Sequence, residues 1–177
     1  PGTVDPLRIT VLRGGVKTFA GEPLSGVTVR VVKDNLGSLD FGQTKTAADG
    51  FFTMAANGGG ELRVSFEKSG YLPVERKTSA PLSDYVVVAD VVMIAPDAAA
   101  TVVTSNAGSP QTHRASTVND SRGMRQATLF FLPGTTAQMV LADGSGQSLS
   151  LLTVRATEFT VGESGPSAMP LPLPPTS

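Results

Sequence analysis

Histidine and cysteine, two side chains often used for acid–base and nucleophilic chemistry, are nearly absent from this sequence. It contains one histidine, His113, within the stretch SPQTHRAS, and no cysteine. A histidine that acts as a general base needs a positioned nucleophile and an orienting carboxylate, and His113 has neither at catalytic spacing. The lack of cysteine excludes disulfides, thiolate metal ligands and cysteine nucleophiles together. We therefore predict that His113 is a solvated loop residue, that the protein has no catalytic residues, and that a hydrolase is the least favoured function.

Four aspartates fall between apolar runs, where they could bind calcium: Asp34, Asp40, Asp49 and Asp84. The segment KDNLGSLD alone offers two or three oxygen ligands. However, the chain lacks the D-x-[DN]-x-[DN]-G spacing of an EF-hand, and no aspartate lies two residues from another. Aspartate and asparagine side chains also hydrogen-bond their own backbone in turns. We predict turn residues here, and neither a metal nor a cofactor.

A glycine-rich segment, NGGGEL from Asn57, has the composition of a phosphate-binding loop. Such a loop needs a helix after its glycines, because the helix N-terminus provides the donors that bind the phosphate. The residues after Gly60 have the pattern of a strand instead. We therefore predict a hairpin turn.

One pair of charged residues suggests a covalent crosslink. Asp90 interrupts the apolar run VVVADVVM on the face shared with Val88 and Val92, and Lys17 lies at the end of the first apolar run. Related two-sheet adhesin domains join such a lysine to a last-strand aspartate or asparagine as an isopeptide. A charge among valines is costly unless it is paired or lies at a solvated sheet edge. We favour the sheet edge, and an intact mass equal to that of the unmodified sequence would exclude the crosslink.

The segment GYLPVERK could present Tyr71 on an exposed tip that binds sugars. Lectin-like surfaces stack sugars on flat aromatic side chains, and this chain is only 6% aromatic, without tryptophan. We predict instead that Tyr71 packs in the core. Loop tips at residues 34–42 and 69–74 are the contact regions of an alternative function, a surface-exposed module that binds carbohydrate or protein.

The elements that must position these residues are short β-strands, since the apolar runs between glycines and prolines are brief and rich in β-branched residues. The alternating runs include LRITVLRG, in which Leu7, Ile9 and Val11 share a face, and GVTVRVVK, in which Val27, Val29 and Val31 face the core. Turn residues separate the runs: Gly14-Gly15, Asn35 to Gly37, Asp49-Gly50, Asn57 to Gly60 and Ser69-Gly70. Short strands at this spacing predict an all-β sandwich over residues 1–95.

A second region follows the sandwich. Residues 96–122 are small and polar, and we predict a linker or long loop. Strands resume over 123–165, where Asp143-Gly144 predicts a hairpin and RATEF, residues 155–159, predicts the end of the last strand. About three strands bury little core, so this partial β unit should pair with the sandwich or with chain outside the sequence.

The C-terminal residues 166–177 are apolar and rich in proline. Proline fixes φ and removes a backbone donor, so this segment should be an extended, polyproline-II-like arm. A disordered tail or linker is the alternative. Because leucines would be unusual in a flexible tail, we predict an interaction arm that docks on another part of a larger protein. Its residues are Met169, Pro170, Leu171, Pro172, Leu173, Pro174 and Pro175.

Composition limits the partners. The 177-residue chain is 40% hydrophobic and 16% charged, as is typical of a globular protein. A net charge of −1 predicts no nucleic-acid partner, and no apolar run approaches the roughly 20 residues of a membrane span, so we expect no membrane insertion. The sequence starts at Pro1 without a signal peptide, so we expect a piece of a longer protein.

Residues 7 to 95 resemble the carboxypeptidase regulatory-like domains, which are transthyretin-like β-sandwiches. The segments that carry the resemblance, in order, are GEPLSGVTVRVV, GQTKTAADGFFTM, ELRVSFEKSGYLPVERK and DYVVVADVVM. The resemblance implies a transthyretin/Ig-like β-sandwich for these residues, so the predicted fold is all-β: this sandwich, the partial second β unit and the proline-rich arm.

Residues from about Ser109 to Ser177 resemble part of the bacterial Rhs/YD-repeat proteins, relatives of teneurins. The matching segments are RQATLFFLPGTTAQMVLADGS, LTVRATEFTVGESGPSAMP and LPPTS. In that family a transthyretin-like module and a plug-like β domain precede a hollow YD-repeat shell, which often encloses a toxin. The resemblance implies a non-catalytic structural module of a secreted or cell-surface bacterial protein, with the shell or another protein as its partner. It also implies that the chain continues beyond Ser177 in the parent.

Overall fold

Nearly all regular structure in this protein is β-strand. The computed structural model describes residues 4–32, 42–159 and 165–171. Over those ranges it contains sixteen strands and one short 3-10 helix, which confirms the predicted all-β class. Contacts between residues divide the chain into two compact units. We call Pro96–Glu158 the inserted unit, and the described residues before and after it the sandwich, because the chain leaves the sandwich after Ala95 and returns at Phe159.

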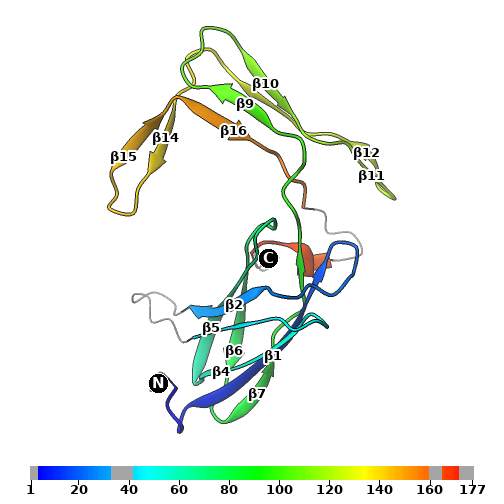
Figure 1. Ribbon diagram of the computed structural model, residues 1–177, viewed down its shortest axis with the longest axis vertical. Helices are drawn as coiled ribbons and strands as arrows, with labels where there is room; N and C mark the ends of the chain where they lie inside the picture. Colours follow the sequence, from blue (N-terminus) through cyan, green and yellow to red (C-terminus); the bar gives the residue numbers. More distant parts are fainter. Residues whose placement is uncertain (1–3, 33–41, 160–164, 172–177) are drawn as a thin grey trace, which may run out of the picture. The chain divides into compact units, whose positions relative to one another are not determined.

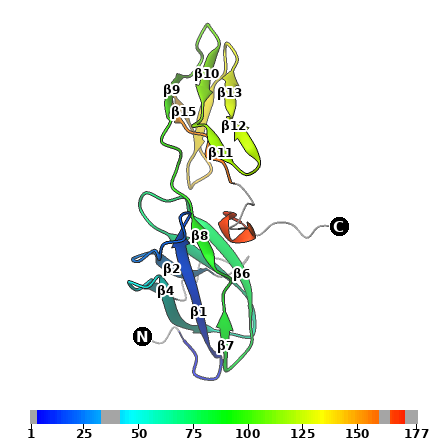
Figure 2. The ribbon, with the colours of Figure 1, turned by 90° about the vertical axis from the view of Figure 1, so that its right-hand side faces the viewer.

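Two sheets form the sandwich (Figure 1). In the first sheet the central strand pairs antiparallel with one neighbour and parallel with two others; its strands are β1 (Ile9–Thr18), β4 (Phe51–Asn57), β7 (Asp84–Val87) and β8 (Val91–Met93). The second sheet is antiparallel, in the order β3 (Gln43–Lys45), β2 (Thr28–Val32), β5 (Gly60–Glu67) and β6 (Val74–Ala80). In Figure 2, β7 and β8 lie along β1.

The hydrophobic core lies between the two sheets. Val27, Val29 and Val31 are fully buried, which confirms the face predicted for that strand. Phe52 of β4 and Phe66 of β5 meet edge to face, with ring centroids 5.6 Å apart, and so join the first sheet to the second. The core therefore confirms the predicted β-sandwich of two packed sheets.

The first strand turns toward the core the face opposite to the one that carries Leu7 and Ile9. Thr10 and Leu12 are buried, whereas Leu7 is 83% exposed and Ile9 is also exposed. The Thr10 hydroxyl donates to the Asp84 carbonyl of the neighbouring strand at 3.1 Å, so burial leaves it satisfied. Since apolar residues occupy both faces of this strand, its pairing decides which set is buried.

Gly14 and Gly15 do not form the predicted turn but lie in the middle of β1. A Cβ on Gly14 would lie 2.8 Å from the Phe52 ring, so glycine allows this close approach. Beside them, β1 advances six residues from Thr10 to Val16 while its partner advances seven, from Asp84 to Val91. This extra residue is a β-bulge, and it divides the predicted final strand into β7 and β8.

The remaining predicted turns have different outcomes. Asp49-Gly50 is a tight turn, in which the Phe51 N–H donates to the Asp49 carboxylate at 3.0 Å, as predicted. The β5–β6 hairpin around Ser69-Gly70 is also confirmed. The glycine-rich segment at Asn57 is not a hairpin, because β4 and β5 belong to different sheets and the segment crosses between them. Asn35 to Gly37 lie outside the described residues.

The inserted unit consists of short paired strands. Residues 96–122 are not the predicted linker, because they contain three of these strands. The strands are β9 (Thr101–Thr104), β10 (Gln111–Arg114), β11 (Val118–Asp120), β12 (Gly123–Arg125), β13 (Thr128–Phe131), β14 (Ala137–Val140), β15 (Gly146–Leu149) and β16 (Leu151–Val154). They pair as β9–β16, β10–β13, β11–β12 and β14–β15, all antiparallel. The three strands within 96–122 have three or four residues each and are mostly polar, so they lack the alternation by which longer strands are recognised.

The hairpin predicted at Asp143-Gly144 is confirmed, with β14 and β15 on either side. The predicted strand at RATEF is not, because β16 ends at Val154 and residues 155–159 are irregular. The Arg155 guanidinium donates there to the carbonyls of Asp97 and Ala98. A side chain thus connects the first and last segments of the inserted unit, where a strand pairing was expected.

The predicted extended arm begins with a helical turn. Residues Gly165–Ala168 form the 3-10 helix η1, and Met169 to Leu171 follow it without regular structure. Pro172, Leu173, Pro174 and Pro175 lie outside the described residues. None of the helices in the described ranges has the length and apolar character needed to cross a membrane.

Candidate functional site

The predicted interaction arm begins on the sandwich itself. We call residues 165–171 the strap. The Glu75 N–H on β6 donates to the Pro170 carbonyl at 2.8 Å, and Ala168 is fully buried. Figure 2 shows η1 beside β8, against which it packs. The first residues of the arm therefore contact the same chain, although we predicted that the arm would dock on another part of a larger protein.

Arg76 of β6 holds the strap through backbone carbonyls. One guanidinium nitrogen, Nη1, donates to the Met169 carbonyl at 2.8 Å and to the Glu75 carbonyl at 2.7 Å. The other, Nη2, donates to the Ser167 carbonyl at 2.8 Å. The residue is 7% exposed, and burial lowers the pKa of its guanidinium. The planar fork of arginine suits this role because it directs several donors at once.

Sequence reasoning missed Arg76, because VERK has the pattern of an ordinary half-exposed strand. The available signal for a buried Arg76 was that it shares a face of β6 with the apolar residues Val74 and Ala80. That signal is weak without knowledge of where residues 165–171 return to the sandwich.

Beyond Pro170, the strap borders a surface hollow of about 380 Å³ lined by Arg63, Glu75, Lys77 and Leu171. Two ion pairs lie on this surface. Arg63 and Glu75 approach to 3.7 Å, and Lys77 and Glu61 to 3.1 Å. Among the described strands, β6 is the edge of its sheet and pairs only with β5. The arm therefore leaves the described residues beside an exposed sheet edge.

His113 is not the predicted solvated loop residue. It lies on β10 and is 1% exposed, with Nδ1 3.0 Å from the Thr101 hydroxyl and with no partner for Nε2 in the described structure. A general base must reach a substrate, and this ring is closed off from solvent. It fills the interior of the inserted unit, whose other fully enclosed side chains are small.

Asp97 organises the start of the inserted unit. Its carboxylate accepts hydrogen bonds from the Ser116 hydroxyl at 2.5 Å, the Ser116 N–H at 2.7 Å and the Ala99 N–H at 3.0 Å. These donors, the Ser116 hydroxyl first, lower the pKa of Asp97 to about 2. The sequence did not single out this residue, because Ser116 lies 19 positions away.

The inserted unit exposes most of its apolar side chains. Of its apolar residues, all of which the structure describes, only Val103 and Ala115 are buried. The exposed large ones are Val102, Met124, Leu129, Phe130, Leu132, Met139, Val140, Leu141 and Leu151. We call this set the apolar surface of the inserted unit. Single exposed apolar side chains are normal on a protein surface, but so many large ones on a unit with so few buried apolar residues favour a partner that covers them.

Lys17 and Asp90 form an exposed ion pair. Their charged atoms are 3.9 Å apart, and both side chains are about half exposed. Asp90 immediately precedes β8, an outer strand whose one partner among the described strands is β1. This position fits the sheet-edge interpretation of Asp90 rather than a charge enclosed among valines.

The other predicted site residues lie apart. Asp49 and Asp84 each accept a hydrogen bond from the backbone N–H of Phe51 and Tyr85 respectively. Asp34 and Asp40 lie outside the described residues, and the described ranges hold no cluster of three metal-ligating side chains. Tyr71 is half-buried and packs against the core, as predicted.

The sandwich is similar in sequence to a domain of known proteins. Residues 4–93 match the family model described as the teneurin TTR-like domain. Teneurin-3 of Danio rerio is 38% identical over 85 residues, which cover 48% of this chain and 3% of that protein. Teneurin-1 of Homo sapiens is 35% identical over 89 residues, covering 50% and 3%. The chain thus spans a small fraction of these relatives.

The similarity of this chain to solved structures is low. The dioxygenase domain of a dioxygenase and carbohydrate-binding protein fusion from Streptomyces sp. SirexAA-E is 19% identical, with a TM-score of 0.41. The match covers 52% of this chain and 86% of that one. A likeness at this level carries no conclusion about the function of this chain.

Proposed function

The chain belongs to the teneurin TTR-like domain family, and from this premise we propose that it is a non-catalytic structural module of a larger Rhs/YD-repeat-type polypeptide. In this proposal the parent is a secreted or cell-surface bacterial protein, and the module seals or decorates a shell that carries a toxin. The family match supports the module, and the resemblance of the second half of the sequence supports its place beside a shell.

The observation that carries the proposal is the apolar surface of the inserted unit. A domain that is stable without a partner buries most of its large apolar side chains, as the sandwich does. The inserted unit leaves Phe130 and Leu132 of the β13 region largely exposed, and Val140 of β14 as well. Each such side chain would gain roughly 1.5–3 kcal/mol on full burial, so a covering partner would stabilise the unit substantially.

The partner in this proposal is the remainder of the parent polypeptide. We expect its shell to cover the apolar surface. This contact would complete a hydrophobic core, which the short strands of the inserted unit do not form alone. A structural role also agrees with the position of His113, which is enclosed where a substrate cannot reach it.

Hydrogen–deuterium exchange of the isolated chain and of the parent polypeptide tests this proposal. We expect peptides that contain β13 and β14 to exchange about tenfold more slowly in the parent, because burial suppresses local opening. Peptides that contain β7 should exchange equally in both. The double variant Phe130→Ser/Leu132→Ser should lose the slowing in the parent.

The matched control is Tyr85→Ser/Val87→Ser. Tyr85 and Val87 of the sandwich are 72% and 80% exposed, close to the 73% and 71% of Phe130 and Leu132. We expect this variant to retain the slowing. Equal exchange of β13 in the isolated chain and the parent would reject the proposed contact, and a parent reading frame without tyrosine–aspartate repeats would remove the Rhs-type parent.

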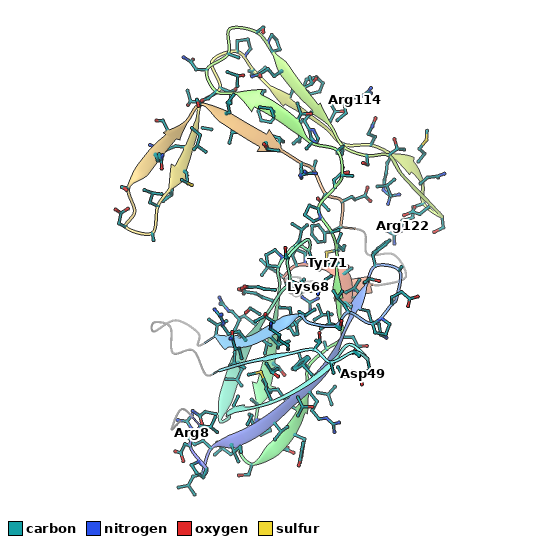
Figure 3. All side chains as sticks on the ribbon, in the orientation of Figure 1. Arg8, Asp49, Lys68, Tyr71, Arg114 and Arg122 are labelled. Carbon is teal, nitrogen blue, oxygen red and sulfur yellow. The ribbon has the colours of Figure 1, made fainter. Side chains whose placement is uncertain are left out.

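A second candidate function is a surface module that binds carbohydrate or protein. One observation favours it, an open hollow of about 660 Å³ lined in part by Gly26, Lys68 and Tyr71. Figure 3 shows Lys68 and Tyr71 at the β5–β6 connection, and Tyr71 belongs to the predicted tip at 69–74. A glycan array without bound ligands would reject the carbohydrate form of this candidate.

A further inference from the structure

We propose that the outer face of the first sheet of the sandwich is a docking surface for a second copy of this chain, and that Arg13 of each copy binds Asp90 of the other. This sheet consists of β1, β4, β7 and β8, and its outer face is the one turned away from the core. The proposal concerns the sandwich, and it depends neither on the shell nor on the apolar surface of the inserted unit.

A continuous apolar strip crosses three strands on this outer face. Val11 of β1 pairs with Ala55 of β4 on one side and with Tyr85 of β7 on the other. Paired residues of neighbouring strands lie about 5 Å apart, so these three side chains adjoin one another. Ile9 lies two residues before Val11, and Val87 two residues after Tyr85, so both extend the strip on the same face. We call these five residues the outer strip.

The outer strip is open to solvent. Tyr85 is 72% exposed and Val87 80%, and Ile9 and Ala55 are exposed as well. Single exposed apolar side chains are normal, but adjoining ones that form a patch mark an interaction site. Tyrosine is also enriched in protein–protein interfaces. The outer strip therefore favours a protein partner.

Arg13 places an unpaired cation on the same face. It lies between Thr53 of β4 and Val87 of β7 in the pairing of the sheet, and it is exposed. Its guanidinium forms no hydrogen bond or ion pair with the described residues. A charge that an apolar partner covers is costly unless it is paired, so the partner must bring an acceptor to Arg13.

Gly15 allows a suitable acceptor to lie nearby on this face. A Cβ on Gly15 would lie 3.3 Å from Asp90 Oδ1 and 3.4 Å from the Phe51 ring, so the carboxylate and the ring both border Gly15. Lys17 approaches the other carboxylate oxygen, Oδ2, at 3.9 Å, and the Asp90 side chain is 59% exposed. A carboxylate beside an exposed aromatic ring suits a guanidinium, which donates to the first and stacks on the second.

The face thus carries both members of a charge pair that does not form within one copy. Arg13 lacks an acceptor among the described residues, and Asp90 Oδ1 lacks a donor there. A second copy supplies the missing partner of each. This self-complementarity is what a symmetric dimer requires, and it favours a second copy over an unrelated protein.

The positions of the two charges fit a two-fold axis. Arg13 and Gly15 are two residues apart on one strand, about 7 Å, and Asp90 borders Gly15. An axis that lies between two such faces and crosses the strands between Arg13 and Gly15 brings each Arg13 opposite Asp90 of the other copy. The outer strip of each copy then lies against the part of the other face that carries Phe51 and Lys17.

Sedimentation velocity of the 177-residue chain over a series of concentrations tests the proposal. We expect a monomer–dimer equilibrium. Arg13→Glu should raise the dissociation constant of the dimer by about tenfold or more, because it sets two carboxylates against each other in both symmetric contacts. Asp90→Arg should have the same effect, with two cations in each contact. A chain that is monomeric at every concentration, or a dimer that either variant leaves unchanged, would overturn the proposal.

An equimolar mixture of the two variants makes the test specific for this charge pair. In a mixed dimer the new glutamate of one chain faces the new arginine of the other, and the unaltered Asp90 and Arg13 face each other. We expect the mixture to dimerise about as tightly as the unaltered chain, although neither variant does so alone. Restored dimerisation would also show that both variants are folded. A mixture that stays monomeric would reject the pairing.

Two further variants are controls for changes elsewhere on the chain. Lys45→Glu is the matched charge reversal, at an exposed position of β3 in the second sheet. Phe130→Ser/Leu132→Ser alters the apolar surface of the inserted unit. We expect both variants to dimerise like the unaltered chain. Loss of the dimer in either one would place the contact on another surface and contradict the proposal.

Discussion

Arg76 shows at the scale of single residues how this sandwich holds a segment that is distant in sequence. Its buried guanidinium makes hydrogen bonds to carbonyls of Ser167 and Met169, which lie 91 and 93 positions away, and to its neighbour Glu75. Backbone carbonyls compensate its burial, because both terminal nitrogens, Nη1 and Nη2, donate to them. One side chain thereby fixes the return of the chain to the sandwich.

Gly50 should be much less tolerant of substitution than Gly21, although both have positive φ. A Cβ at Gly50 would lie 2.5 Å from the Val16 carbonyl oxygen, whereas a Cβ at Gly21 would meet nothing within 4 Å. We expect Gly21→Ala to cost about 1 kcal/mol of the free energy of unfolding, from backbone strain alone. Gly50→Ala should cost about 3 kcal/mol, since the clash adds to the strain. Urea denaturation measures both values, and equal costs would contradict this prediction.

Asp97 should make the inserted unit sensitive to acid. Hydrogen bonds from Ser116 hold its pKa at about 2, below the ordinary 3.8, so they favour the ionised folded state. Their stabilising contribution is present above the ordinary pKa and is lost as the pH falls through about 2. An NMR titration of the Asp97 carboxyl should show the low pKa, and Ser116→Ala should raise it. An unchanged pKa in that variant would mean that another group is responsible.

At the scale of elements, pairing decides what the residue pattern leaves open. β1 carries apolar side chains on both faces, and its pairing with β4 and β7 buries the face that contains Thr10 and Leu12. The bulge between β7 and β8 allows the two parts of the last strand to follow one central strand. In the inserted unit, strands form from segments with little apolar alternation.

Two leucines near β1 test which face is buried. Leu12 is fully buried and Leu7 is 83% exposed. We expect Leu12→Ala to lower the free energy of unfolding by about 2–5 kcal/mol, because it removes buried methyl groups and leaves a cavity. Leu7→Ala should change it by less than about 0.5 kcal/mol. Denaturant titrations of the two variants provide the comparison, and the reverse order would mean that β1 pairs in another register.

At the scale of the whole molecule, the two units differ in what stabilises them. The sandwich has a continuous core that includes Val64 and Phe66, whereas Val103 and Ala115 are the buried apolar residues of the inserted unit. Local stability follows buried apolar contact, so the two units should not unfold together.

Native-state hydrogen exchange in low urea should resolve this difference. We expect the Val103 amide of β9 to exchange through a low-energy opening, and the Val64 amide of β5 only through unfolding of the sandwich. Exchange of both amides with the same free energy and the same urea dependence would show that the chain unfolds as one unit.

Much of the sandwich follows from the residues. Val27, Val29 and Val31 predict a buried strand face because they alternate with polar residues, and Asp49-Gly50 predicts a turn because glycine tolerates positive φ. The transthyretin-like, teneurin-type resemblance is confirmed by the family match over residues 4–93. The predicted function of the arm stays a prediction, since only Met169, Pro170 and Leu171 of its residues are described.

The sequence alone determined the features that depend on neighbours along the chain: strand faces with clean alternation, tight turns and the proline-rich end. Tertiary structure decided the features that depend on distant residues. The strands of 96–122, the burial of His113, the bulge beside Gly14 and the Arg76 contact with the strap each arise from pairing between separate segments. Local patterns do not encode these contacts, because the hydrogen bonds and packing that stabilise them come from partners far away in sequence.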